Sequence, residues 1–423
     1  MVCDDCRLGK GEKLILPRIP TSERGKATHD RIIEKSIELF KENGYQEVSA
    51  AMISKTCGIG NASFYQYFSS KEEILDQIVH DLTICINQDV TNAMSGVKVA
   101  DDHEKLQIFI KTFIKSISNK INEYSVFRNA EFLFPEISKA FYDSLYKFLA
   151  DEFFDMEKDS KTKRAFYLFV IGIVNFLVME YGTSKNEQID DKIADKAFDL
   201  IFYGIDPDNH RINEEAFEFL PKVEGEKIEF RSQWSITHKK ILEASEQLFG
   251  KKGYSRSKIS DISNLADVGL GTFYVHFDSK IEALRELVSS TLENLKANLR
   301  RYVWRFTDRR DAEIAGYIGF LDFFKRHKEM YSIVREMEFV DSKTEIFYYS
   351  EISKSYMKPL ESAFKNNEYR IFDPVLLSYM LMGIGHQAGL ELLIERDADL
   401  NECSEYVKLM SQFLMHGFRG MEG

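Results

Sequence analysis

The sequence is poor in proline, in cysteine and in long hydrophobic runs. Only seven prolines occur among 423 residues, so little interrupts the formation of long helices. The cysteines are odd in number and scattered, which argues against a disulfide framework and favours a reducing cytoplasm. They are Cys3, Cys6, Cys57, Cys85 and Cys403. These shortages speak against a small secreted scaffold held by disulfides.

The most apolar stretch, residues 165–181, is shorter than a usual membrane span and contains Asn175 and Glu180. The N-terminal segment lacks the long apolar region of a signal peptide. We therefore expect a cytoplasmic protein that makes no use of a membrane.

The chain is acidic overall, with a formal net charge of −12, and this speaks weakly against nucleic-acid binding. The charge is unevenly spread, however. Residues 231–284 hold eight Lys and Arg against six Asp and Glu, whereas residues 22–75 hold seven against eight. An acidic remainder can therefore accompany a locally basic face. The length predicts two or more domains.

The chain contains an internal repeat. Residues 28–75 align without a gap on residues 237–284, and about 40% of the positions are identical. The repeat continues more faintly, with matches between 124–132 and 331–339, between Gly172 and Gly383, and between 202–204 and 415–417. We interpret the chain as a duplicated unit of roughly 200 residues. The polar segment 206–230 is the expected linker.

The repeated segment has the pattern of four successive helices. In the first copy, Ile32, Ser36 and Phe40 belong to an apolar stripe at helical spacing, and Gly44 suits a C-terminal cap. Short helices are expected over 50–56, capped by Ser49, and over 61–67, and Ser70 opens a fourth. Everything beyond, in both copies, is typical of helices, so the predicted fold class is all-α.

Two short helices joined by a tight turn form a helix-turn-helix, which presents its second helix to the major groove of DNA. Gly58, Gly60 and Gly269 supply the small residues that the turn needs. One side of the second helix must be buried, and Phe64 with Phe68 can provide it, as can Phe273 with Phe277. The side chains left for bases and phosphates are Asn61, Ser63, Tyr65, Gln66 and Tyr67 in the first copy, and Leu270, Thr272, Tyr274, Val275 and His276 in the second.

The segments GIGNASFYQYFSSKEEIL and VGLGTFYVHFDSKIEAL resemble the signature of the TetR family of transcription regulators. The resemblance covers both copies from the first to the fourth helix. It implies a small DNA-binding domain followed by a helical domain that binds a small molecule and dimerises through its last two long helices. It also implies DNA contacts from the third helix, the start of the second and the lysine that opens the fourth. These positions are Ser49, Tyr65, Tyr67 and Lys71, then Lys258, Tyr274, His276 and Lys280.

The second copy departs from the family signature. Asp267 replaces a glycine of the turn, and its charge opposes phosphate. Leu270 and Val275 make the presumptive reading face more apolar, which suits contact with thymine methyl groups. Gly60 and Gly269 replace the usual serine at the helix start, which weakens that cap. We expect the two copies to prefer different half-sites.

The resulting architecture is a tandem duplication of a helix-turn-helix bundle plus a helical ligand-binding and dimerisation domain. Its expected parts are an N-terminal arm (1–27), a DNA-binding domain (28–82), a helical domain (83–205), the linker (206–230), a second DNA-binding domain (231–291) and a second helical domain (292–423). The long dimerisation helices are expected over 164–181, 191–203, 374–394 and 401–418.

The middle helices are rich in aromatic residues, which suit either a small hydrophobic or aromatic effector or a plain aromatic core. In the first copy they include Phe109, Phe113, Phe127, Phe141 and Tyr142. Arg128 and Glu131 recur as Arg335 and Glu338, three residues apart, and either pair with each other or orient a ligand. His386 stands where Asn175 stands in the first copy, and a core histidine is the simpler interpretation. The candidate ligand contacts are thus Phe127, Arg128, Glu131, Asn175, Arg335, Glu338 and His386.

The favoured function is a DNA-binding regulator, in that family usually a ligand-responsive repressor, that reads a palindromic or pseudo-palindromic operator. It acts as an intrachain pseudo-dimer or as a homodimer. The alternative is a sensor or protein-interaction module of the same fold that has lost DNA binding. No motif supports an enzyme, and we expect no catalytic residue, cofactor or metal; the pair Cys3 and Cys6 alone is a weak zinc signal. Basic residues from Arg7 to Lys26 form either a phosphate-tracking arm or a solvated tail.

Overall fold

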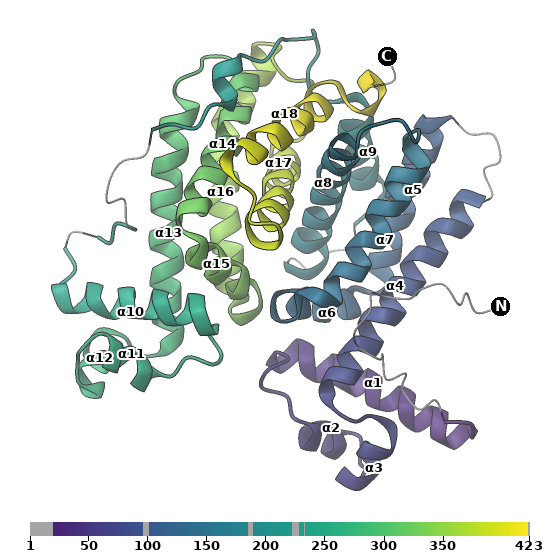
Figure 1. Cartoon of the computed structure of the whole chain (residues 1–423), viewed down its shortest axis with the longest axis vertical. Coiled ribbons are helices and arrows are strands. Elements are labelled where there is room, and N and C mark those ends of the chain that lie inside the picture. The colour runs from purple at the N-terminus through teal and green to yellow at the C-terminus, as the bar shows by residue number, and fades with distance from the viewer. Residues whose placement is uncertain (1–19, 96–100, 185–188, 222–227, 232, 422–423) are drawn as a thin grey trace. The chain divides into compact units, whose positions relative to one another are not determined.

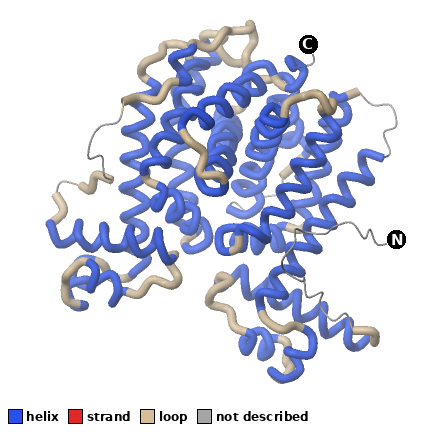
Figure 2. Tube along the Cα trace, viewed as in Figure 1, coloured by secondary structure: helices blue, strands red, loops and turns tan. Residues whose placement is uncertain are grey.

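The computed structural model describes residues 20–95, 101–184, 189–221, 228–231 and 233–421, and every regular element in these ranges is a helix (Figure 2). The expectation of an all-α fold is confirmed for this part of the chain. The chain divides between Asp81 and Leu82 into two compact units.

The first unit holds α1 (Glu23–Asn43), α2 (Ala50–Thr56), α3 (Asn61–Tyr67) and the start of α4 (Lys71–Ser95). Ser22 and Ser49 cap α1 and α2 by accepting backbone hydrogen bonds, and Gly44 ends α1 at a φ of 78°. The predicted bounds of α2 and α3 are confirmed. Ser49 caps the start of α2 and the turn at Gly58 separates the two helices, whereas α3 follows Gly60 without a side-chain cap.

The second unit contains both helical domains and the second helix-turn-helix. Its first half comprises α5 (Asp102–Asn119), α6 (Ile121–Leu133), α7 (Pro135–Phe153), α8 (Ser160–Leu177) with the π-helical turn η1 (Val178–Ser184), α9 (Asp191–Tyr203) and the 3₁₀ turn η2 (Glu214–Phe217). The second half comprises α10 (Ile236–Lys252), α11 (Ile259–Leu265), α12 (Leu270–His276), α13 (Lys280–Val303), α14 (Arg309–Arg326), α15 (Lys328–Val340), α16 (Ser342–Lys365), α17 (Pro374–Gly389) with η3 (Leu390–Glu395), α18 (Leu400–His416) and η4 (Phe418–Met421).

The two helical domains pack against each other along α8 and α17, which lie side by side (Figure 1). At their crossing the backbones nearly touch: a Cβ on Gly172 would lie 2.6 Å from the carbonyl oxygen of Gly383, and one on Gly383 would lie 2.3 Å from that of Gly172. The matched glycines of the internal repeat therefore meet each other. A residue that meets its own counterpart is the mark of an isologous, two-fold contact.

A second pair of matched glycines repeats this arrangement at the ends of α9 and α18. Gly204 and Gly417 both have positive φ, at 71° and 69°, and a Cβ on either would lie 2.2 Å from a carbonyl oxygen of the other repeat. The Ile205 amide also donates to the carbonyl of Leu414 at 2.8 Å. No larger residue fits at these two positions.

The segment Ser160–Gly182 is long and apolar enough to span a membrane, by length and composition only. In its most apolar window, however, 89% of the residues are buried inside the protein. Its apolar residues Phe166, Phe169, Ile173, Phe176 and Leu177 are buried here. The helix is apolar on all sides because α17 and α18 cover it.

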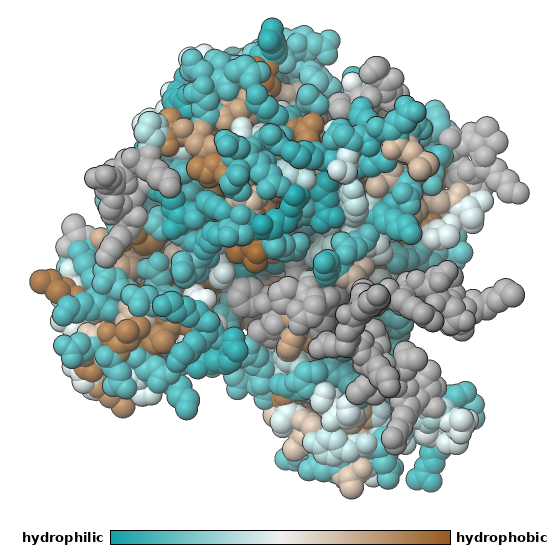
Figure 3. Space-filling model, viewed as in Figure 1, coloured by the Kyte–Doolittle hydropathy of each residue, from teal (hydrophilic) through white to brown (hydrophobic). Residues whose placement is uncertain are grey.

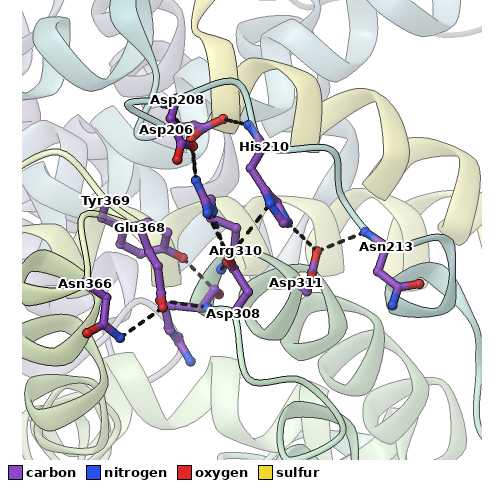
Figure 4. A network of polar contacts seen from close by, with 11 residues as sticks. Asp206, Asp208, His210, Asn213, Asp308, Arg310, Asp311, Asn366, Glu368 and Tyr369 are labelled. Atoms are coloured by element: carbon purple, nitrogen blue, oxygen red, sulfur yellow. Dashed lines mark hydrogen bonds and ion pairs between the residues drawn. The ribbon is translucent and has the colours of Figure 1, made fainter.

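The first half of the expected linker is held against α14 by a polar network (Figure 4). The Arg310 guanidinium is 5% exposed and donates to Asp206 at 2.8 Å, to Asp308 at 2.7 Å and also to Asp208. His210 contacts Asp311 at 3.0 Å. Residues 206–213 are thus fixed to the second helical domain by ion pairs that partly bury their charges.

Candidate nucleic-acid interface

In the first helix-turn-helix, α3 has one buried and one exposed side. Phe64 and Phe68 are 0% exposed and form the buried side, as the four-residue spacing predicts. Tyr65 is 58% exposed on the other side, with Asn61 and Gln66 also exposed. Ser63 and Tyr67 are half-buried. Five of the residues predicted to reach DNA thus lie on one accessible helix, and their contacts with DNA stay a prediction.

The second helix-turn-helix repeats this geometry with a different surface. Phe273 and Phe277 are buried, while Leu270, Tyr274 and Val275 are 52%, 52% and 79% exposed. Thr272 and His276 are half-buried. Hydrophobic side chains accordingly reach the surface over α10–α12 (Figure 3). This face favours apolar contacts over hydrogen bonds.

The turn needs a left-handed residue at only one position. Gly58 has a φ of 64°, and Asp267 at the equivalent position has a φ of 56°. Gly60 and Gly269 precede α3 and α12 at φ values of −72° and −68°, an extended conformation open to any residue. Gly60 and Gly269 instead serve as N-caps without a side-chain hydrogen bond, as expected where glycine replaces the usual serine at the helix start.

The residue that precedes α2 differs from the equivalent residue that precedes α11. Ser49 accepts a hydrogen bond from the Met52 amide at 3.2 Å and so caps α2. Lys258 stands at the equivalent position before α11 and makes no capping bond. Both residues are exposed. The serine is thus already used by its own helix, whereas the lysine extends a charge into solvent.

The lysines that open α4 and α13 are tied into their own domains. The Lys71 ammonium donates to the carbonyls of Tyr45 and Val48, at 2.9 and 2.8 Å, and lies 4.4 Å from the centre of the Tyr45 ring. Lys280 does the same with Tyr254 and Ser257, at 2.8 and 2.9 Å. Burial lowers the pKa of Lys71. These lysines hold the loop after the first helix, a positioning role that the motif did not reveal.

The candidate ligand residues gather around a buried charged cluster between the helical domains. Glu338 pairs with Arg335 of its own repeat at 3.0 Å and with Arg128 of the other repeat at 3.1 Å. The pairing of Arg335 with Glu338 is thus confirmed. Arg335 also donates to the Nε2 atom of His386, and burial together with Arg335 depresses the pKa of that histidine well below its usual value.

The remaining candidates lie elsewhere or lack a described side chain. Phe127 packs against Phe141 and Tyr142, with ring centres 4.7 and 5.8 Å apart. Asn175 is buried, and both of its amide atoms lack a partner among the described residues. The side chain of Glu131 lies outside the described part of the structure, as do the Cys3 and Cys6 pair and the arm residues before residue 20.

A cavity of about 490 Å³ opens in the second helical domain, between α13, α14, α15, α16 and α17. Eight of its 25 lining residues are aromatic, and five of these are tyrosines: Tyr317, Tyr331, Tyr348, Tyr349 and Tyr356. His386 lines it, alone among the seven candidate ligand residues, and Glu313 and Arg309 supply charge. The aromatic residues of the first repeat, expected to form either an effector lining or a plain core, do not line this cavity. Phe109 and Phe113 stack on each other instead.

The geometry defines a chain with two helix-turn-helix units. Residues 32–78 and 241–287 each match the profile of the family described as bacterial regulatory proteins, tetR family. The chain therefore carries two TetR-family helix-turn-helix units in tandem.

Individual proteins are similar to this chain over limited stretches. An uncharacterised HTH-type transcriptional regulator in the lacX 3' region of Lactococcus lactis subsp. lactis is 29% identical over 32% of this chain and 66% of its own length. The HTH-type transcriptional activator FasR of Mycolicibacterium smegmatis is 27% identical over 24% of this chain and 46% of its own length. A crystal structure of a putative TetR-family regulator from Syntrophomonas wolfei covers 42% of this chain and 94% of its own, at 20% identity and a TM-score of 0.39. The chain thus matches less than two thirds of the length of these curated relatives.

Proposed function

We propose that this protein is a ligand-responsive, DNA-binding transcription regulator of the cytoplasm. The observation that carries the proposal is the shared geometry of α3 and α12. Each helix buries a pair of phenylalanines and exposes the following tyrosine, Tyr65 or Tyr274, by more than half of its surface. An exposed helix after a tight turn is the element that enters a major groove.

We propose further that one chain can act as a pseudo-dimer on an operator with two related half-sites. The close contacts of Gly172 with Gly383 and of Gly204 with Gly417 support this, because they bind the two helical domains as a two-fold interface binds two subunits. The different exposed residues of α3 and α12 favour an imperfect palindrome over a perfect one.

A path from the cavity to the second DNA-binding unit supports ligand control. Tyr331 and Val334 of α15 line the cavity, and the next turn of α15 carries Glu336. The Glu336 carboxylate accepts a hydrogen bond from the Tyr254 amide at 2.6 Å, directly after α10. Gly250 of α10 packs on Glu329, where an added Cβ would lie 2.5 Å from the Glu329 Cβ. A ligand that displaces α15 therefore displaces the base of the second helix-turn-helix.

The test is binding of the full chain to the DNA upstream of its own coding sequence at several salt concentrations, with the mass of the complex measured alongside. Affinity should fall steeply with salt, because phosphate contacts release counterions. One bound chain adds 49.2 kDa, and two add twice that. Absence of binding at low salt by the folded chain would refute DNA binding and favour the sensor or interaction module.

Single substitutions assign the contacts. Tyr65→Ala and Tyr274→Ala should each weaken binding by about 1 kcal/mol or more, since each removes an exposed reading side chain. Met156→Ala is the matched control, because Met156 is 98% exposed and lies on a loop of the first helical domain. Unchanged affinity for Tyr274→Ala would remove the second unit from the DNA interface.

Lys71→Ala separates phosphate contact from loop positioning. A lost phosphate contact lowers the salt slope by about one unit. A purely positioning lysine leaves the slope unchanged and lowers the melting temperature of the free protein, because the carbonyls of Tyr45 and Val48 lose their donor. Transcription from the bound promoter, with and without the protein, then gives the sign of regulation.

A further inference from the structure

The two helical domains follow the same register but are filled differently. Helices α5 and α14 have 18 residues each, α6 and α15 have 13 each, and every element of the second domain from α14 to α16 begins 207 residues after its counterpart. In this register Gly316 is equivalent to Phe109, and Ser355 is equivalent to Phe148. Two phenyl rings of the first domain are thus absent from the second.

These two positions decide whether the space is occupied. In the first domain Phe109 is 0% exposed and stacks between Phe113 and Phe148, with ring centres 5.6 and 5.3 Å apart. In the second domain Gly316 and Ser355 line the cavity of about 490 Å³, a size typical of small-molecule sites. The cavity therefore lies where the first domain keeps a stack of aromatic rings.

The charged groups that enter the cavity also belong to the second domain alone. In the same register, Leu106 is equivalent to Glu313, and Asp102 is equivalent to Arg309. Arg309 donates to the Glu313 carboxylate, which is 2% exposed and also accepts from the Tyr356 hydroxyl at 3.1 Å. The Nε of Arg309 has no acceptor among the described residues. This atom is itself buried and offers no donor to the cavity, and the charges of Arg309 and Glu313 cancel.

His386 supplies the hydrogen-bond donor of the cavity. Its Nε2 must accept, because the guanidinium of Arg335 can only donate, so the ring proton of the neutral histidine sits on Nδ1. That Nδ1 has no acceptor in the described part of the chain. Closer to solvent, Lys296 pairs with Glu351 at 3.4 Å and Arg300 is exposed. The interior therefore offers one hydrogen-bond donor, the His386 Nδ1, together with aromatic side chains and no uncompensated charge.

We propose that only the second helical domain senses a ligand, that each chain takes one molecule, and that this ligand is a neutral, largely apolar or aromatic compound with a hydrogen-bond acceptor. The first domain serves as its packed partner. Contact of the ligand with His386 reaches that partner through Arg335, Glu338 and Arg128, which form one continuous set of contacts. This inference rests on the proposed function, in which ligand binding controls the DNA-binding units.

The test is a titration of the full chain with N-phenyl-1-naphthylamine, a neutral aromatic probe that fluoresces in apolar sites and contains no strong charge. One probe should bind per chain. Gly316→Phe should weaken that binding at least tenfold, since it restores the ring that the first domain has. An added Cβ at Gly316 meets only Val303, at 3.7 Å, so the ring enters the cavity without a clash at its base.

Ser355→Phe is the second filling variant and covers the case in which Gly316→Phe does not fold. Phe109→Leu is the matched control, which changes the counterpart position and should leave probe affinity unaltered. The proposal is overturned by two probes per chain, by wild-type affinity in both filling variants, or by no probe binding to the wild-type chain. DNA binding is measured on the same samples. If the chain binds one probe but no DNA, the proposed function is refuted while the inference of a single ligand site stands.

Discussion

The two helix-turn-helix units have the same backbone and different chemistry. At the left-handed position of the turn the first unit has Gly58 and the second has Asp267, yet the φ angles are 64° and 56°. Before α2 the first unit has Ser49, which caps the helix, whereas before α11 the second unit has Lys258, which makes no capping hydrogen bond. The buried phenylalanines are kept in both. Duplication has thus preserved what the fold needs and changed the residues that solvent or DNA would meet.

The two helical domains differ in the opposite way, inside rather than outside. Phe109 and Phe148 fill the first domain, and Gly316 and Ser355 leave space in the second. The comparison teaches that two copies of one fold can separate a structural from a sensing part by changing a few core positions. The variants below test this difference between the copies.

The largest effect on the free energy of unfolding is expected at the buried carboxylate of Glu338, which pairs with an arginine of each helical domain. Glu338→Ala leaves the guanidinium groups of Arg128 and Arg335 buried without their carboxylate, and the side-chain exposures of these three residues are 1%, 6% and 2%. Loss of one partner of a buried pair costs about 3–5 kcal/mol. We expect urea denaturation to show this loss. Glu38→Ala, which breaks the exposed pair with Lys35, should cost less than about 1 kcal/mol, and equal effects would contradict a buried shared charge.

The stability of the protein should depend on pH through a histidine of the second repeat. Burial lowers the pKa of His327, which precedes α15, from 6.5 to about 4, and the counterpart position in the first repeat holds Lys120. Protonation therefore favours the unfolded chain. The stabilisation is complete above pH about 6.5 and is lost as pH falls towards about 4, by up to about 3 kcal/mol. Denaturation at pH 7.5, 5.5 and 4.5 measures it, and His327→Gln should flatten the slope; an unaltered slope excludes this histidine as the cause.

The two-fold contact can be broken at its glycines. Gly383→Ala places a Cβ 2.3 Å from the carbonyl oxygen of Gly172, so the helices must separate, at a cost of about 1–3 kcal/mol. Gly60→Ala is the control, because nothing lies within 4 Å of a Cβ there and φ is −72°. Its effect on the free energy of unfolding should stay below about 1 kcal/mol, because the weaker N-cap of alanine and the lower entropy of its unfolded chain act in opposite directions. A similar effect for both variants would show that the α8–α17 crossing tolerates a wider spacing.

The smallest effect should come from exchanging the turn residues of the two helix-turn-helix units. Asp267→Gly relieves a left-handed aspartate and should stabilise the second unit by up to about 1 kcal/mol, while Gly58→Asp should destabilise the first by a similar amount. Hydrogen exchange of the α11–α12 and α2–α3 amides reports each unit separately. Changes of the same sign in both units would show that backbone strain at the turn does not set the difference in stability between the two units.

Much of the fold could be predicted because the signals are local. The caps, the glycines and the apolar stripes lie within one or two helical turns of the ends that they set, so α2, α3 and α9 have the predicted bounds. The buried phenylalanines of both recognition helices followed from their spacing alone. The gapless match between the two copies gave the tandem architecture without any tertiary information.

The candidate site could be predicted only in part, because its remaining features depend on contacts between distant residues. Lys71 looks like a phosphate ligand in the motif, and only the folded loop shows it bonded to Tyr45 and Val48. Arg128 has an acid three residues away in sequence, yet the described acid beside it is Glu338 of the other copy, 210 residues on. Charge and composition cannot rank such partners.

The sequence by itself determined the helices, the duplication and the faces that the recognition helices expose, since periodicity and capping act over a few residues. Tertiary structure decided which aromatic residues fill a core and which surround a cavity. Phe109 and Tyr317 are both apolar-face residues of equivalent helices, but one stacks on rings and the other borders empty space. That outcome depends on the volume contributed by every neighbouring helix at once, which no local pattern encodes.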